Sequence, residues 1–315
     1  MPTSSAHCPV PDRFSLNHHL FHVSKAPDRL RHLILEISRA TKYIHQAIRT
    51  TEAGLAGTRN SFGEDQVKLD VLSDDIIRQH LCESQIVAAF ASEERDELVV
   101  LDDDALYSVV YDPLDGSSLV EVNFAIGSIF GIYEGKDIIG RRPREQVAAV
   151  YALYGPRTLL VYSTGNGVHE FILNEVGEFM ELRPNLGVGD VAKNFSPGNL
   201  SAVVDTPAYG ALLQDWISEK MTLRYSGCMV ADVHHVLSKG QGVFMNIGGS
   251  KYPDGKLRMV FECGPFAYLM EQAGGTASDG VNAILDKKIT GLDQRTPIII
   301  GSKNEVERCC RVLRA

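Results

Sequence analysis

The sequence has no long apolar runs. None approaches the roughly 18 residues that a membrane-spanning helix requires, so we expect no contact with a membrane. The first 22 residues contain four histidines and the charged pair Asp12–Arg13, but no apolar core of the kind that secretory signals have. Together these absences predict a cytoplasmic protein.

Cysteine and positive charge are also scarce. Six cysteines are scattered through 315 residues without a CxxC pair, which favours reduced thiols over a disulfide framework or a zinc site. The adjacent pair Cys309–Cys310 is interpreted as one surface thiol and one core thiol of a single helix. Lys and Arg number 31 against 40 Asp and Glu, and the net charge is −9. Such a surface repels nucleic acid, although a few local cations can still hold a small anion.

What remains is the composition of an ordinary globular protein, with 44% hydrophobic and 23% charged residues. At roughly 100–200 residues per domain the length favours two domains, and the Gly- and Pro-rich stretch 183–200 divides them into 1–185 and 186–315.

Apolar residues at helical spacing predict helices over 28–50 and 67–81. Strands are predicted over 108–133 (with a turn after 112), 147–151, 158–162, 170–173 and 257–261, and further helices over 207–219, 231–237 and 265–273.

The most informative motif is Asp-Pro-Leu-Asp-Gly-Ser-Ser at 112–118, at the end of an apolar strand. Its two carboxylates are oxygen ligands of the kind that Mg²⁺ prefers. The backbone N–H groups of the glycine and serines that follow can cradle a phosphate. The same residues also form exposed Asx-type turns, so the motif by itself leaves both interpretations open.

Three further acidic elements, Asp65, Asp70 and Glu93–Glu94, each have a simple interpretation as exposed helix or turn residues. If they converge with the first motif on one pocket, their mutual repulsion requires cations. A two-metal phosphoryl-transfer site supplies those cations. Convergence is therefore the feature that would separate the two interpretations.

A third stretch, KLRMVFE, alternates charged and apolar residues. As a strand it places Lys256, Arg258 and Glu262 on one side, where the cations can bind a phosphate and the carboxylate a metal. The alternative is an edge strand that faces water. Arg224–Tyr225 similarly offer a phosphate clamp and a hydroxyl contact, whereas His234–His235 point in different directions on a helix and are interpreted as structural.

Together these motifs resemble the magnesium-dependent, lithium-sensitive sugar phosphatase superfamily. The stretches 224–234 and 256–275 narrow the resemblance to the class I fructose-1,6-bisphosphatase family, from about residue 28 to the end. Within that family the chain looks most like sedoheptulose-1,7-bisphosphatase, in the tracts 60–63, 154–158, 196–200 and 292–296. Asn246 also fits that branch, because fructose-bisphosphatases usually have a tyrosine there. The implied fold is α/β, a two-domain layered α-β-α-β-α sandwich of the sugar phosphatase type.

The resemblance also implies roles, residue by residue. Metal binding, with Mg²⁺ as the cofactor, is implied for Asp65, Glu93, Asp112, the carbonyl of Leu114, Asp115 and Glu262. Asp70 and Glu94 match the carboxylates that activate the attacking water. Substrate binding is implied for Gly116, Ser117, Ser118, Asn199, Arg224, Tyr225, Lys256 and Arg258. Arg224 matches a residue that reaches across a subunit boundary, so a homodimer or homotetramer is expected.

The implied activity is Mg²⁺-dependent hydrolysis of the 1-phosphate of sedoheptulose 1,7-bisphosphate, which yields sedoheptulose 7-phosphate and phosphate. Loss of the tyrosine ring at Asn246 would make room for the longer sugar. The alternatives are a fructose-1,6-bisphosphatase and an enzyme of dual specificity. An inositol or nucleotide phosphatase is disfavoured by Lys256 and Arg258, because a monophosphate needs no remote clamp. A non-catalytic phosphosugar sensor is the alternative from a different class.

Overall fold

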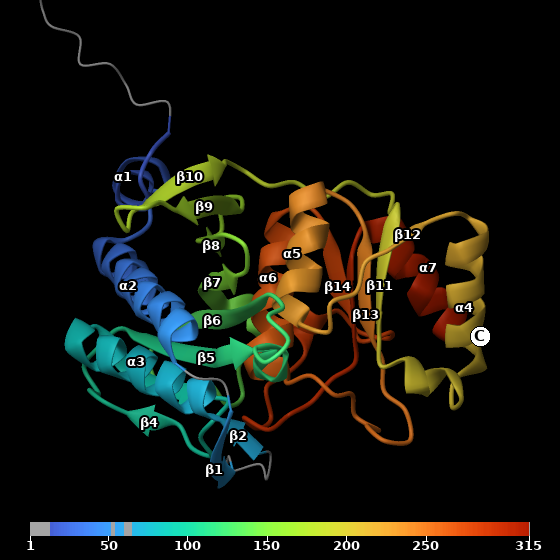
Figure 1. Cartoon of the computed structure of the whole chain (residues 1–315), viewed down its shortest axis with the longest axis horizontal. Helices are drawn as coiled ribbons and strands as arrows, with labels where there is room; N and C mark the ends of the chain where they lie inside the picture. Colours follow the sequence, from blue (N-terminus) through green and yellow to red (C-terminus); the bar gives the residue numbers. More distant parts are fainter. Residues whose placement is uncertain (1–12, 52–53, 60–64, 315) are drawn as a thin grey trace, which may run out of the picture.

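The computed structural model describes residues 13–51, 54–59 and 65–314 (Figure 1). Within these ranges, every helix is too short or too polar to span a bilayer. The chain forms two main sheets separated by a layer of helices, and each sheet has further helices on its outer face (Figure 1). This is the layered α-β-α-β-α sandwich that was predicted.

The large sheet has eight strands in the order β10-β9-β8-β7-β6-β5-β3-β4. Their bounds are β3 (Val87–Ser92), β4 (Val99–Val100), β5 (Tyr107–Asp115), β6 (Ile126–Glu134), β7 (Gln146–Tyr154), β8 (Thr158–Ser163), β9 (His169–Leu173) and β10 (Phe179–Arg183). The central strands are buried along nearly their whole length, because helices cover both faces of the sheet. The outer helices are α2 (Asp28–Thr50), which spans the predicted residues, and α3 (Lys68–Ser84).

The small sheet has five strands in the order β12-β11-β13-β15-β14. Their bounds are β11 (Asn194–Gly198), β12 (Thr222–Leu223), β13 (Val243–Asn246), β14 (Thr276–Ser278) and β15 (Ile298–Gly301). Helices α5 (Met229–Lys239) and α6 (Gly264–Gln272) lie between the two sheets, while α4 (Pro207–Ser218) and α7 (Lys303–Arg314) cover the outer face (Figure 1). Apolar residues from both sheets join in the core around α5 and α6.

Short elements complete the chain. At the N-terminal end, α1 (Leu16–His18) continues into the π-helical turn η1 (His19–Val23), and β1 (Leu55–Arg59) pairs with β2 (Asp65–Val67). The 3₁₀ turns are η2 (Ser117–Leu119), η3 (Pro143–Glu145), η4 (Leu200–Val203) and η6 (Ile284–Asp286). A second π-helical turn, η5 (Met259–Cys263), leads directly into α6.

Two local predictions are wrong. The predicted strand 257–261 is largely η5, because its side chains are buried in succession instead of alternating between core and solvent. The N–H of Cys263 reaches the carbonyl of Arg258, 3.1 Å away, which is the longer bonding step of a π-helix. The second wrong prediction is that one thiol of the pair Cys309–Cys310 lies on the surface. Both thiols are buried, because α7 packs against α4 as well as against the small sheet.

Candidate metal and phosphate site

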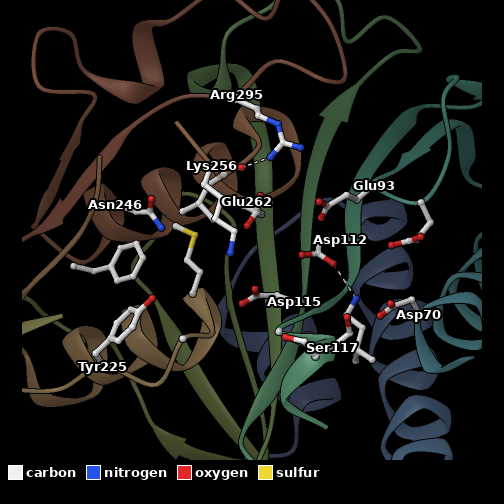
Figure 2. Close-up of a pocket in the computed structure, with 18 residues that line it drawn as sticks. Asp70, Glu93, Asp112, Asp115, Ser117, Tyr225, Asn246, Lys256, Glu262 and Arg295 are labelled. Atoms are coloured by element: carbon white, nitrogen blue, oxygen red, sulfur yellow. Dashed lines mark hydrogen bonds between the residues drawn. The ribbon is translucent and has the colours of Figure 1, made fainter. Parts of the chain in front are cut away.

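A cavity of about 320 Å³ lies at the end of β5, where the large sheet faces η5, α5 and the small sheet (Figure 2). It brings together most of the side chains that were singled out in the sequence. The predicted residues that line it are Asp70, Glu93, Glu94, Asp112, Leu114, Asp115, Gly116, Ser117, Ser118, Tyr225, Lys256 and Glu262. Three of the four acidic elements therefore converge on this cavity. The fourth element is Asp65, whose side chain lies outside the described residues.

The two carboxylates of the first motif belong to β5, whereas Gly116 follows the strand and Ser117 and Ser118 begin the 3₁₀ turn η2. Strand β5 continues to Asp115, with a register shift against β6 between Asp112 and Asp115. Asp112 accepts a hydrogen bond on Oδ1 from the Leu114 N–H, 2.9 Å away, as an Asx turn does. However, Asp112 is only 5% exposed. The turn geometry is thus present, but it directs a carboxylate into the cavity.

Asp115 is held by donors from α5. Its Oδ2 accepts a hydrogen bond from the Val230 N–H at 2.7 Å and from the Cys228 thiol at 3.1 Å. The next residue, Gly116, has φ +80°, and a Cβ there would lie 2.9 Å from Cys228 Cβ. Only glycine fits this conformation and this contact. The close approach anchors the 112–118 motif to the helix layer.

Glu262 is positioned by η5. Its Oε2 accepts a hydrogen bond from the Arg258 N–H at 2.6 Å, and the Arg258 Nε donates to Glu93 Oε1 at 2.8 Å. The Arg258 side chain is 1% exposed and does not line the cavity. Arg258 therefore joins two acidic elements from different parts of the chain. The predicted strand would instead have placed its guanidinium in the cavity, facing a substrate phosphate. Its role in substrate binding stays a prediction.

Asp112, Asp115 and Glu262, here called the acidic centre, each offer one oxygen within 4.8 Å of the others. Burial raises the pKa of Asp112 and Glu262 well above their ordinary values, and the neighbouring carboxylates raise these pKa values further. Burial also raises the pKa of Asp115, although its hydrogen bonds to Val230 and Cys228 act in the opposite direction. Crowded, buried oxygen donors of this kind fit a hard divalent cation.

The opposite wall of the cavity is polar and positively charged. Figure 2 shows Lys256, Tyr225 and Asn246 facing the acidic centre. Asn246 is 7% exposed, and its Oδ1 has no hydrogen-bond partner among the described residues. Arg295, which was not predicted as a site residue, also lines the cavity and donates a hydrogen bond to the Lys256 carbonyl. Arg295 belongs to the tract 292–296 that carries part of the resemblance, but nothing in that tract indicated a position in the site.

Two other predicted residues lie away from this cavity. Asn199 has φ +48° and precedes η4, where its amide donates to the Ile247 carbonyl at 2.6 Å and its Oδ1 accepts from Ser201. Arg224 is exposed and donates to the Leu223 carbonyl. His234, interpreted as structural, bonds to Tyr151 and Ser238. The substrate roles of Asn199 and Arg224 stay predictions.

Two family models match the chain. "Fructose-1-6-bisphosphatase, N-terminal domain" covers residues 12–184, and "Fructose-1-6-bisphosphatase, C-terminal domain" covers residues 188–314. The class 1 fructose-1,6-bisphosphatase of Geobacter sulfurreducens is 50% identical over 281 residues, 89% of each chain. The chloroplastic sedoheptulose-1,7-bisphosphatase of Triticum aestivum is 40% identical over 293 residues, 91% of this chain and 74% of the wheat chain.

Two solved structures share the whole architecture. The fructose-1,6-bisphosphatase of Leishmania major matches with a TM-score of 0.90 and 30% identity, over 96% of this chain and 99% of its own. A Toxoplasma gondii chain assigned as a sedoheptulose-1,7-bisphosphatase matches with a TM-score of 0.89 and 33% identity, over 96% and 98%. The chain therefore belongs to the fructose-1,6-bisphosphatase family and is a sugar bisphosphatase, a phosphoric monoester hydrolase.

Proposed function

We propose that the chain removes the phosphate from carbon 1 of a ketose bisphosphate, with fructose 1,6-bisphosphate as its main substrate and Mg²⁺ as its metal. The observation that carries this proposal is the acidic centre, three carboxylates within 4.8 Å, beside the backbone of 116–118 and opposite Lys256. The Geobacter fructose-1,6-bisphosphatase is more similar to the chain than the wheat sedoheptulose-1,7-bisphosphatase is. This supports the six-carbon sugar over the seven-carbon sugar that was expected from the sequence.

The acidic centre would hold the metal, with Glu93 and the Leu114 carbonyl beside it at the cavity wall. A bound divalent cation neutralises phosphoryl oxygens and stabilises the departing alkoxide. The carboxylates contribute by being fixed before substrate arrives, because Val230, Cys228, Leu114 and Arg258 already hold them through hydrogen bonds. A preorganised site of this kind needs little reorganisation during the reaction.

Two further carboxylates line the cavity outside the acidic centre. Asp70 lies in the first turn of α3 and is 6% exposed, and Glu94 follows β3 and is half-buried. In the proposal they orient the attacking water and accept its proton, which general base catalysis requires. Gly116, Ser117 and Ser118 hold the phosphate that leaves.

On the opposite wall, Lys256 and the Tyr225 hydroxyl hold the sugar and its second phosphate. This remote contact positions carbon 1 against the metal and makes binding energy available to the reacting centre. We also propose that the chain works as a homodimer or homotetramer in which the exposed Arg224 faces a neighbouring copy. Light scattering after size-exclusion chromatography measures that assembly directly.

Sedoheptulose 1,7-bisphosphate is the second candidate substrate, and Asn246 supports it. This small side chain, with an unpartnered Oδ1, lies in the cavity wall where a larger residue would fill space. The space that this small side chain leaves can accommodate the additional carbon of the longer sugar. Replacement of Asn246 by Tyr should then lower kcat/KM for the seven-carbon sugar more than for the six-carbon sugar.

The test is phosphate release from fructose 1,6-bisphosphate and sedoheptulose 1,7-bisphosphate, compared by kcat/KM with Mg²⁺ and after chelation. We expect release from both sugars to stop with chelator and to return with Mg²⁺. A tenfold preference corresponds to only about 1.4 kcal/mol of differential transition-state binding, so both sugars must be measured. Binding of either sugar without any turnover would contradict the proposal and favour a phosphosugar sensor.

A further inference from the structure

A second group of metal-ligating side chains lies at the opposite edge of the large sheet. Residues 13–23 approach β10 there, through a bridge between Ser15 and Met180 and a hydrogen bond from the Glu181 N–H to the Phe14 carbonyl at 2.7 Å. Figure 1 shows α1 beside β10 and β9. This contact brings His19 of η1 against the end of the sheet.

Three side chains meet at this edge. Each side chain offers one possible ligand atom, and these three atoms lie within 4.8 Å of one another. They are a ring nitrogen of His19, a ring nitrogen of His169 and a carboxylate oxygen of Glu181. The two imidazole rings are 4.3 Å apart between centroids. His19 is 1% exposed and packs against Tyr162 and Phe171. The group is thus built from η1, β9 and β10, and none of its members lines the active-site cavity.

The spacing of His19 and Glu181 suits an intervening ion better than a direct contact. Nε2 of His19 lies 3.7 Å from Oε1 of Glu181, which exceeds the range of an N–H···O hydrogen bond. Zinc bonds to imidazole nitrogen and to carboxylate oxygen are each about 2.0–2.2 Å long. Two such bonds, meeting at an open angle, span this separation through one ion.

Both imidazoles have a partner for the nitrogen that faces away from an ion. His19 Nδ1 lies 2.5 Å from the Tyr162 hydroxyl, and His169 Nε2 lies 3.1 Å from the Asn166 carbonyl. Metal-ligating histidines commonly donate their second N–H to such oxygens, which fixes the tautomer. The Asn185 N–H is 3.4 Å from His169 Nδ1, a long contact that an ion would replace. Burial lowers the pKa of His19 to about 4, so its ring is neutral at pH 7, which is the ligating form.

We propose that His19, His169 and Glu181 form a binding site for one zinc-type divalent transition metal, which ties the N-terminal segment to the edge of the large sheet. Two imidazoles and one carboxylate select such an ion over Mg²⁺, which prefers oxygen ligands. Three protein ligands leave a fourth position for water. The site is structural, and it is independent of the substrate that the active site takes.

The experiment titrates the metal-free full-length protein with Co²⁺ and Zn²⁺ in excess Mg²⁺. The Glu262→Gln variant serves as the background, because it weakens the competing acidic centre. We expect one equivalent of Co²⁺ to give the visible absorption of a four-coordinate site with nitrogen ligands, and Zn²⁺ to displace it. Zn²⁺ should also raise the melting temperature, because it binds only the folded state.

Variants identify the ligands. His169→Gln and Glu181→Gln should each weaken Zn²⁺ binding at least tenfold, whereas His18→Gln and His22→Gln, exposed controls from the same segment, should leave it unchanged. Tyr162→Phe, which removes the hydroxyl beside His19, should weaken binding about 10- to 100-fold. The proposal is overturned if no ion binds in excess Mg²⁺, or if the control variants reduce binding as much as the ligand variants do.

Discussion

Two regions of the molecule that bury carboxylates compensate the negative charge in different ways. In the first region Glu170, which is fully buried, accepts hydrogen bonds from both Arg183 Nε at 2.5 Å and Arg183 Nη2 at 2.9 Å. The same guanidinium bonds to Ser238, and the His234 ring lies 3.6 Å from Glu170. These residues, here called the Glu170 group, contain their own cation.

The second region is the acidic centre, in which each of three carboxylates has one oxygen within 4.8 Å of the others. These carboxylates are held mainly by hydrogen bonds from backbone N–H groups and a thiol. Such neutral donors orient a carboxylate but leave its charge uncompensated. Burial by itself therefore does not mark a functional carboxylate. A buried acid with a bidentate arginine stabilises the fold, whereas several buried acids without matching cations indicate a place for a ligand of positive charge.

The largest expected effect comes from removing one charge of the acidic centre. Asp112→Asn should lower kcat by about 10³-fold, equivalent to about 4 kcal/mol in the barrier, because one carboxylate of the proposed metal site loses its charge. Steady-state kinetics at saturating Mg²⁺ measure the loss. Asp104→Asn, at an exposed position, is the control and should retain full activity. A fully active Asp112→Asn variant would show that the acidic centre is not catalytic.

The Glu170 group should respond in the opposite way. Arg183→Met leaves Glu170 buried without its cation, and we expect the free energy of unfolding to fall by about 3 kcal/mol, since loss of one partner of a buried pair is costly. Denaturant unfolding measures this, and kcat per folded molecule should be unchanged. The double variant Glu170→Gln/Arg183→Met should recover much of the stability. If the single variant is as stable as the parent chain, the pair does not compensate Glu170 as inferred.

Mg²⁺ should stabilise the protein more at high pH than at low pH. The folded-state pKa values of Asp112 and Glu262 are raised. Above pH about 4–5 the folded metal-free protein therefore binds more protons than the unfolded chain does. The stability of the metal-free protein falls as the pH rises through the raised pKa values. The cation requires the deprotonated form and reverses this loss. At a hundred times its dissociation constant Mg²⁺ contributes about 2.7 kcal/mol.

Thermal unfolding with and without Mg²⁺, from pH 5 to pH 9, checks this expectation. The increase in melting temperature caused by Mg²⁺ should grow with pH in the parent chain. It should be much smaller at every pH in Glu262→Gln. An increase that is independent of pH would mean that these carboxylates do not control metal binding.

The smallest expected effect concerns His234 of the Glu170 group. Burial lowers the pKa of His234 from 6.5 to about 3. Below pH 6.5 the unfolded chain therefore binds a proton that the folded protein does not bind. As a result, the free energy of unfolding decreases as the pH is lowered towards 3. At pH 5 this amounts to about 2 kcal/mol, at 1.36 kcal/mol per pH unit. His234→Gln should reduce the loss of stability between pH 7 and pH 5, as followed by urea unfolding, whereas the exposed His22→Gln should not.

Local patterns accounted for much of the fold. The apolar spacing over 28–50 predicted α2 at its observed bounds, and the Gly-Gly pair after α6 follows the end of that helix. Such signals are local because helical periodicity and glycine conformations depend on near neighbours in the chain. The prediction failed at 257–261, where complete burial between layers replaced the alternation that a strand requires.

For the site, the sequence by itself determined which carboxylates and hydroxyls are present and, through their motifs, the family. Only the tertiary structure decided which charges are compensated. Arg183 and Glu170 are 13 residues apart and Arg258 and Glu93 are 165 apart, yet each pair is in contact. Arg295 lines the cavity and Arg258 does not, although only Arg258 was predicted as a site residue. Charge compensation depends on distances through space and on burial, and neither is encoded in the spacing of residues along the chain.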